Sequence, residues 1–242
     1  MNRKLETSLI EEIKVSSWKL MTIPEQTSKI CLAAVEHNGY VVRYVKHQTK
    51  AICLAAVKQN GYAIQDVKNQ TEIVCLEAVK QNPEALKYVK NKTESVCLNA
   101  IRQRGLVLEY VEDQTNEMCL EAVKQNGYAL KFVKDQTEEM CLEAVKQNGY
   151  ALKYVKNQTE KICIEAFNKD NYNFDDLNLK DKKLCIKLIE YFMKMNRKEF
   201  NFFNIVVNKY NNDKRINNIY TKYNLWKYVK INNDNIKYTM LL

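Results

Sequence analysis

Eight cysteines stand at one constant spacing, and that spacing constrains the fold more than any other feature of this 242-residue chain. Each follows its predecessor by 22 positions: Cys31, Cys53, Cys75, Cys97, Cys119, Cys141, Cys163 and Cys185. A fixed period between about 20 and 50 residues is typical of solenoids and other repeat architectures. The sequence therefore predicts a tandem array of supersecondary units that stack on one another.

Seven units begin at threonines 22 residues apart, from Thr27 to Thr159, and the unit at 137–158 reads TEEMCLEAVKQNGYALKYVKNQ. A degenerate unit precedes them, with Leu9 in the cysteine position, and another follows, with Asp181 in place of threonine. We therefore divide the chain into a degenerate capping repeat at 1–26, seven repeats at 27–180, and a degenerate repeat with a C-terminal cap at 181–242. Terminal units of a solenoid need such caps for solubility.

The first half of each unit has the pattern of a helix about three turns long. Threonine is a good N-cap, and acidic residues such as Glu138 and Glu139 in the next positions suit the positive end of the helix dipole. In the same unit Met140, Ala144 and Val145 recur with helical periodicity.

The second half of the unit is compatible with a strand or a helix, as a leucine-rich repeat has a similar period. The third unit favours a helix, since Asn82-Pro83-Glu84 reads as N-cap, first helical residue and acidic first turn. Proline also cannot adopt positive φ, so this position is not an obligatory left-handed turn. Because 22 residues leave room only for a short second helix, partly 3₁₀, the predicted fold is an all-α solenoid.

The cysteines are predicted to be small buried residues in a reducing compartment, the host cytoplasm if the chain is viral. Packed helices lie about 8–10 Å apart, and equivalent cysteines in neighbouring units would then exceed the roughly 7 Å that a disulfide tolerates. Metal binding or redox sensing is the alternative, but a zinc site usually needs CxxC pairs, which the sequence lacks. No apolar run approaches a signal peptide or a membrane span, so no membrane contact is expected.

The formal net charge of +9 is not spread evenly. Residues 27–180 carry 21 basic and 20 acidic side chains, whereas residues 181–242 carry 13 and 5. A basic C-terminal region could bind nucleic acid or an acidic protein, or have no contact role. The candidate nucleic-acid residues there are Lys222, Lys227 and Lys230.

Two rows of basic residues follow the repeat and are the candidate partner-binding residues. The first row is Lys58, Lys80, Arg102, Lys124 and Lys146. The second row is Arg43, Lys87, Lys131 and Lys153, interrupted by Gln65 and Glu109. Glutamates three residues before some members of the first row also permit the simpler interpretation of a solvated face with ion pairs along each helix.

A tyrosine row, formed by Tyr40, Tyr62, Tyr128, Tyr150 and Tyr172, is predicted to lie in the core between repeats. Base stacking is the alternative role. The only histidines, His37 and His47, are predicted to be surface variants in one unit, against a metal or general-base role.

The recurring text CLEAVKQNGYALKYVKNQT, at 141–159, resembles the domain-of-unknown-function family numbered 4116, which is abundant in amoeba-infecting giant viruses. The resemblance covers about residues 17–180 and implies no established activity. Two places depart from it: Asp66 replaces the second tyrosine of its unit, and Arg104-Gly105-Leu106 replaces Asn-Gly-Tyr.

Repetition itself argues against catalysis, because an enzyme needs a unique set of residues. The units at 115–136 and 137–158 differ at three positions, so neither holds a specialised residue that the other lacks. We expect no enzyme and no cofactor. The leading hypothesis is a scaffold that binds a protein through its variable positions; the alternative is a nucleic-acid-binding helical repeat that uses the C-terminal region.

Overall fold

The computed structural model describes residues 3–169, 177, 179–195, 200–210 and 213–225, and over residues 3–169 α-helices alternate with short 3₁₀ helices. The α-helices are α1 (Arg3–Val15), α2 (Ser28–His37), α3 (Lys50–Gln59), α4 (Glu72–Gln81), α5 (Glu94–Gln103), α6 (Asn116–Gln125), α7 (Glu138–Gln147), α8 (Glu160–Lys169), α9 (Lys182–Lys194), α10 (Phe200–Lys209) and α11 (Lys214–Lys222). The 3₁₀ helices are η1 (Ser17–Thr22), η2 (Gly39–Tyr44), η3 (Gly61–Asp66), η4 (Pro83–Tyr88), η5 (Gly105–Tyr110), η6 (Gly127–Phe132) and η7 (Gly149–Tyr154).

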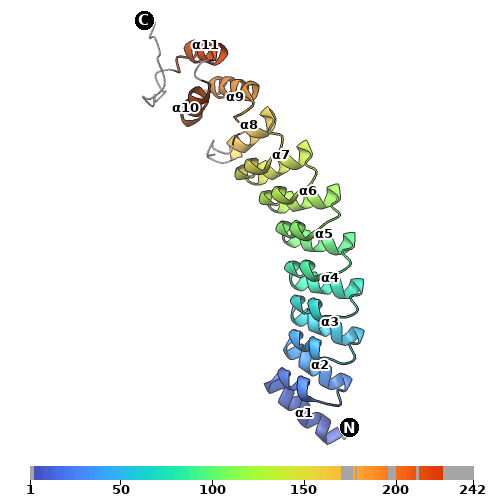
Figure 1. Cartoon of the computed structure of the whole chain (residues 1–242). Coiled ribbons are helices and arrows are strands. Elements are labelled where there is room, and N and C mark those ends of the chain that lie inside the picture. Colours follow the sequence, from blue (N-terminus) through green and yellow to red (C-terminus); the bar gives the residue numbers. More distant parts are fainter. Residues whose placement is uncertain (1–2, 170–176, 178, 196–199, 211–212, 226–242) are drawn as a thin grey trace.

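From α2 to α7, each α-helix packs on the α-helix of the next unit and on the 3₁₀ helix before and after it in the chain, so the units form a single curved stack (Figure 1). The all-α solenoid predicted from the cysteine spacing is confirmed. The described ranges contain no strand, and the 3₁₀ helix that starts at Pro83 shows that the helical interpretation of the second half-unit is correct. None of the helices in these ranges is both long and apolar enough to cross a bilayer.

The two helices of a unit are separated by one extended residue that serves both of them. In the fifth unit the Thr115 hydroxyl caps α6 by accepting a hydrogen bond from the Met118 amide at 3.3 Å. Asn126 then leaves the helix with φ −152° and ψ 113°, and its side chain accepts from the Tyr128 amide at 3.0 Å to start η6. A single asparagine therefore ends one helix and caps the next.

The glycine that opens most 3₁₀ helices is required by close packing and not by its backbone angle. No glycine in the described ranges has a positive φ. At Gly127, however, a Cβ atom would lie 2.4 Å from the Ala144 carbonyl oxygen of the next unit. Glycine lets the 3₁₀ helix approach the neighbouring α-helix to a distance that other side chains exclude.

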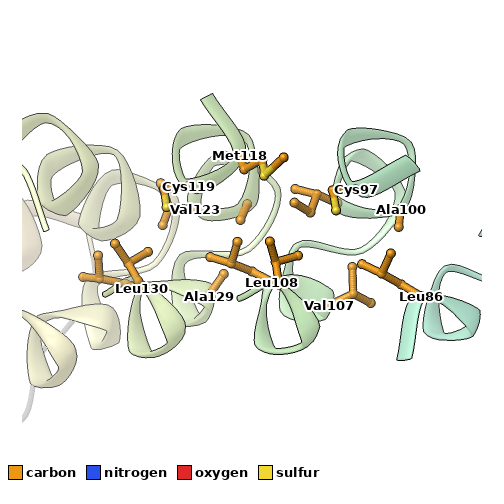
Figure 2. Packing of buried hydrophobic residues seen from close by; sticks show 14 of the residues in the cluster. Leu86, Cys97, Ala100, Val107, Leu108, Met118, Cys119, Val123, Ala129 and Leu130 are labelled. Atoms are coloured by element: carbon orange, nitrogen blue, oxygen red, sulfur yellow. The ribbon is translucent and has the colours of Figure 1, made fainter. Parts of the chain in front are cut away.

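The core is one continuous layer between the α-helices and the 3₁₀ helices (Figure 2). In the fifth unit Cys119 and Val123 come from α6, and Ala129 and Leu130 come from η6; all four are at most 4% exposed. Each half-unit thus supplies one apolar face, and burial of a side chain such as leucine contributes about 1.5–3 kcal/mol. Because the two helices of a unit cover these faces only in part and neighbouring units cover the rest, the array is stable only as a stack.

All eight cysteines are free and buried in this layer, so the prediction that they are small core residues is confirmed. Burial raises the pKa of the Cys141 thiol to about 11 and that of Cys163 to about 12. These thiols are therefore neutral near pH 7 and have little of the thiolate character that metal binding and redox chemistry require.

The two ends of the stack are built differently. At the N-terminal end α1 and η1 bury Ile13 and Leu20 against the stack, while Val15 is 85% exposed. At the C-terminal end, α9 begins with a side-chain N-cap as the repeat units do: the Asp181 carboxylate accepts a hydrogen bond from the Leu184 amide at 3.1 Å. Helices α9 to α11 then form a cluster around buried aromatic side chains, namely Phe192, Phe202, Phe203 and Tyr220.

Candidate partner-binding surfaces

The solenoid presents two exposed surfaces that repeat with every unit. We call the exposed side of α3–α7 the α edge, and the exposed side of η1–η7 with the loop after each the 3₁₀ edge. The first basic row predicted from the sequence lies on the α edge and the second lies on the 3₁₀ edge. The two rows have different neighbours, which separates them chemically.

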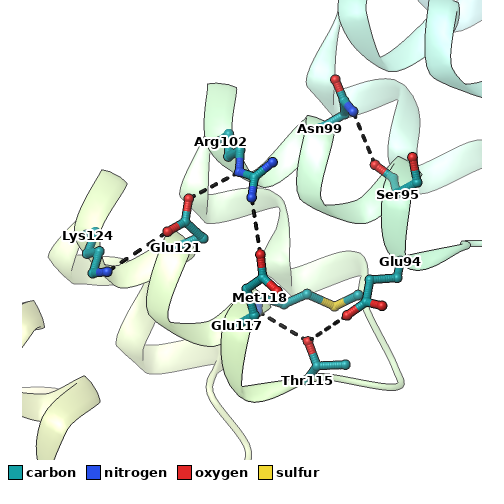
Figure 3. Close-up of polar contacts among 9 residues, drawn as sticks. All are labelled: Glu94, Ser95, Asn99, Arg102, Thr115, Glu117, Met118, Glu121 and Lys124. Atoms are coloured by element: carbon teal, nitrogen blue, oxygen red, sulfur yellow. Dashed lines mark hydrogen bonds and ion pairs between the residues drawn. The ribbon is translucent and has the colours of Figure 1, made fainter.

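On the α edge, the basic side chains pair with glutamates. Lys80 lies 3.2 Å from Glu77, and Lys146 lies 3.0 Å from Glu143. Arg102 bridges two carboxylates of the next helix, Glu117 and Glu121, each at 3.2 Å (Figure 3).

The same figure shows Glu121 reaching Lys124 at 4.0 Å. Lys58 is exposed. Most of this row is therefore engaged in surface ion pairs, and such pairs contribute little to stability.

On the 3₁₀ edge, three of the four basic side chains lie over aromatic rings. The ammonium groups of Lys87 and Lys131 lie 5.8 Å and 4.5 Å from the ring centroids of the residues that follow them, Tyr88 and Phe132. The fourth member, Arg43, instead donates two hydrogen bonds to Asp66 at 2.8 Å and 3.0 Å. Cation–π contacts hold an ammonium group in place without removing its charge.

The sixth unit has the densest of these contacts. Lys153 lies 5.3 Å from the ring centroid of Tyr128 and 4.9 Å from that of Tyr154. These two rings belong to neighbouring units and meet edge to face, with centroids 6.0 Å apart. One lysine therefore joins aromatic residues from the fifth and sixth units.

The prediction that the tyrosine row lies in the core is wrong. Tyr40, Tyr62 and Tyr128 are half-buried, Tyr150 is 40% exposed, and Tyr172 lies outside the described residues. The physical reason is the 3₁₀ geometry, in which residues i and i+3 share a face. Tyr128 therefore projects with Lys131 on the solvent side, while the buried side of η6 is taken by Gly127 and Leu130.

Adjacent units join some of these rings into separate pairs, which together form an aromatic stripe along the 3₁₀ edge. Each pair joins a first-turn residue to a last-turn residue 26 positions later: Trp18 with Tyr44, Tyr62 with Tyr88, and Tyr128 with Tyr154. All three pairs are edge to face, an arrangement that stabilises aromatic contacts beyond their burial. The stripe therefore has a structural role as well as an exposed surface.

A hollow of about 620 Å³ opens on this edge, lined by side chains of the second to sixth units. At one end, Glu84 accepts a hydrogen bond from the Tyr110 hydroxyl at 2.9 Å and forms an ion pair with Arg104 at 2.9 Å. The hydrogen bond to this carboxylate raises the pKa of Tyr110 to about 12. At the other end lie Lys131 and Tyr154.

In the fifth and sixth units, charge is segregated between the two edges, although the array as a whole is nearly neutral. In the fifth and sixth units, α6 and α7 carry five glutamates and two lysines. Residues 126–136 and 148–158, which form the 3₁₀ edge of the same units, carry four lysines and one aspartate. Each of these two units therefore has an acidic side and a basic side.

Two glutamine ladders, which sequence reasoning missed, hold the units together. One is seen at Gln136, whose side-chain amide donates to the Leu130 and Tyr154 carbonyls at 3.2 Å and 2.9 Å and accepts from the Lys156 amide at 2.9 Å. Six glutamines from Gln26 to Gln158 occupy this position, and it is interrupted only by Lys92.

The other ladder is seen at Gln147, which accepts from the Gly127 amide of the preceding unit at 2.7 Å. The signal was present in the sequence, because the same residue, glutamine, recurs at two fixed positions of almost every unit, whereas a purely solvated face accepts any polar residue.

The remaining sequence candidates belong to neither basic row. His37 and His47 are exposed, and within the described ranges no three His, Cys, Asp or Glu side chains are grouped to hold a metal ion. Lys222 is exposed on α11, with its ammonium group 5.1 Å from the Tyr223 ring centroid. Lys227 and Lys230 lie outside the described residues.

Three overlapping stretches of the chain, residues 71–115, 93–137 and 115–160, match one family, described as Domain of unknown function (DUF4116). Each stretch spans two units of the stack, and the overlaps follow the 22-residue period. No curated protein and no solved structure matches the chain. Residues 71–160 thus belong to the DUF4116 family, as a tandem array of its repeats.

Proposed function

We propose that this chain is a non-catalytic scaffold for protein–protein interaction, acting in a reducing cytoplasm and, as the family resemblance implies, encoded by a large DNA virus. The observation that carries the proposal is the 3₁₀ edge, where half-buried aromatic rings and exposed lysines recur in neighbouring units. Tyrosine is enriched at protein interfaces because one side chain supplies both apolar area and a polar group. The array repeats the same residues many times, which suits an extended binding surface better than a catalytic site.

Capture of partners from infected-cell lysate tests this proposal. Three immobilised proteins are compared: the unchanged chain, a Tyr128→Ser/Tyr154→Ser variant of the 3₁₀ edge, and a Lys124→Glu/Lys146→Glu variant of the α edge. We expect a specific protein partner that is lost only with the tyrosine variant. Circular dichroism must first show that all three proteins keep the same helical content. If no partner is recovered, or if both variants lose it equally, the proposal fails.

A second candidate function is nucleic-acid binding through the C-terminal region. The excess of basic residues at 181–242 favours it, and Lys222 is an exposed member of that set. Phosphate contacts would make the affinity fall steeply with salt. Electrophoretic mobility shifts at low salt should then weaken in a Lys222→Glu/Lys227→Glu/Lys230→Glu variant. An unchanged shift would exclude this region as the binding site.

A further inference from the structure

The fifth and sixth units present the same aromatic and basic group twice in succession. Tyr128, Lys131 and Phe132 of η6 correspond to Tyr150, Lys153 and Tyr154 of η7. Both lysines are exposed and lie over rings of this group. A partner that runs along the stack would therefore meet two equivalent contacts, one repeat apart.

The ammonium groups in this pair of units are preorganised by the rings. A lysine that lies over a ring has lost part of its rotamer freedom before binding, which lowers the cost of ordering it against a partner. A carboxylate that reaches this surface would gain a charge-assisted hydrogen bond beside an apolar ring edge. On the α edge of the same units, Lys146 already pairs with Glu143 at 3.0 Å.

Extended polypeptide fits this surface better than stacked bases. Base stacking needs an open ring face, but Tyr128 and Tyr154 are packed edge to face, with an interplanar angle of 84°, and Lys153 lies over both. The hollow on this edge is long, since it is lined from the second unit to the sixth. Carboxylates placed at intervals along a chain can reach the lysines without entering between rings.

The fourth unit sets the boundary of the basic surface. Its residue in the second basic row is Glu109, which is exposed, and it is followed by Glu112 and Asp113. Glu84, which takes the first-turn aromatic position of the third unit, is already paired with Arg104. The basic surface therefore begins at η6 and continues through η7.

We propose that the 3₁₀ edge of the fifth and sixth units binds an extended acidic segment of a partner protein, with Lys131 and Lys153 contacting its carboxylates. The charge complementarity follows from the four lysines and one aspartate on this edge. The inference rests on the proposed scaffold function and specifies the chemistry of its partner.

The test uses a fluorescein-labelled peptide of 12 residues in which aspartate alternates with leucine, and the same peptide with asparagine in place of aspartate. Binding to the full chain is measured by fluorescence anisotropy. We expect the aspartate peptide to bind with a Kd below about 1 mM and to weaken as ionic strength rises, while the asparagine peptide binds at least about tenfold more weakly.

Charge reversal supplies the matched comparison. Lys131→Glu/Lys153→Glu should weaken binding of the aspartate peptide by about tenfold or more, whereas Lys124→Glu/Lys146→Glu, in the same two units, should change it by less than about twofold. Glu109→Lys extends the basic row by one unit and should strengthen binding by about twofold to threefold. All variants must retain the circular dichroism spectrum and urea midpoint of the unchanged chain.

Several results would overturn the inference. Equal weakening by the two charge-reversal pairs would show that only overall charge matters. Tighter binding of an oligothymidylate, lost in Lys131→Glu/Lys153→Glu, would make nucleic acid the occupant. Self-association seen by sedimentation equilibrium and abolished by the same variant would make a second copy the occupant.

The result of partner capture separates this inference from the proposed function. If lysate partners are captured through the 3₁₀ edge while the aspartate peptide does not bind, this inference fails and the scaffold proposal stands. If no lysate partner is captured, the scaffold proposal fails.

Discussion

Two kinds of junction join neighbouring units, and they solve the same packing problem differently. At the junction between the fifth and sixth units, the Gly127 amide donates to Gln147 at 2.7 Å, and the absence of a Cβ lets the Ala144 carbonyl approach. Equivalent bonds run from Gly39 to Gln59, Gly61 to Gln81 and Gly105 to Gln125. These junctions need both a small residue and a free N–H group.

The junction between the third and fourth units has neither. Pro83 carries a Cβ and lacks an N–H group, so it cannot donate to the glutamine opposite it. Gln103 donates instead to the carbonyls of Val79 and Asn99, both at 3.0 Å. The Val79 carbonyl is the acceptor that a residue at position 83 would satisfy in a continuing α-helix, so the glutamine replaces the missing backbone donor. The glutamine at this position therefore bonds whichever backbone group the preceding unit leaves unpaired.

Placing alanine at the first residue of the 3₁₀ helix should reveal the largest difference in stability between the two junctions. Gly127→Ala would place a Cβ 2.4 Å from the Ala144 carbonyl and should lower the free energy of unfolding by about 2–3 kcal/mol, because the backbones must move apart. Pro83→Ala should change it by less than about 1 kcal/mol, because this junction already accommodates a Cβ. Urea unfolding followed by circular dichroism measures both.

The reactivity of the cysteine thiols should show where in the array Gly127→Ala loosens the packing. Opening of the junction between the fifth and sixth units should expose Cys119 and Cys141. Both thiols should therefore react faster with a chromogenic disulfide reagent in Gly127→Ala than in the unchanged chain. Cys31, far along the stack, is the internal control. Equal destabilisation by Gly127→Ala and Pro83→Ala would refute the distinction between the two junctions.

Removal of the glutamine should have the next largest effect. Gln147→Ala leaves the buried Gly127 amide without its acceptor and should cost about 1–2 kcal/mol. Gln103→Ala removes bonds to two carbonyls, one of them that of the buried Val79, and should cost about 0.5–1 kcal/mol, because a carbonyl that loses one bond is tolerated better than an amide left with no acceptor. The same urea experiment decides between them, and a larger loss for Gln103→Ala would reverse our assignment of which junction depends more on its glutamine.

The smallest expected difference in stability is between substitutions at two helix N-termini. Thr115 caps α6, so Thr115→Val should cost about 1 kcal/mol. Thr71, at the start of α4, makes no side-chain cap, and its hydroxyl is buried without a partner. Thr71→Val should therefore leave stability within about 0.3 kcal/mol of the unchanged chain or increase it slightly. Thermal unfolding of the two variants would show the difference, and equal losses would indicate that Thr71 also caps its helix in solution.

Much of the fold could be predicted from the sequence because the relevant signals are local. The cysteine spacing predicts the repeat, threonine predicts the helix start, and Pro83 predicts a second helix. The hydrogen bonds between units could not be predicted, because the partner of Gln147 depends on which residue of the preceding unit lies opposite it. That register exists only once the stack is built.

The candidate surface was predicted in part. The two basic rows are visible in the sequence, but only the structure shows that one lies beside glutamates and the other over aromatic rings. The tyrosine row was wrongly assigned to the core, because alternating apolar residues do not reveal which side of a 3₁₀ helix faces solvent. Its period of three residues places Tyr128 directly in line with Lys131, whereas a period of 3.6 would set the two side chains about 60° apart.

The glutamine bonds have a consequence for how this chain can change in length. The bonds of Gln136 and Gln147 between units reach only the adjacent unit, at separations of 18 to 20 residues. Inserting another copy of residues 115–136 after position 136 would therefore give every new junction the donors, acceptors and small residues that it needs. An array built this way can gain or lose whole units by recombination without any compensating substitution, and its binding surface would lengthen or shorten in equal steps.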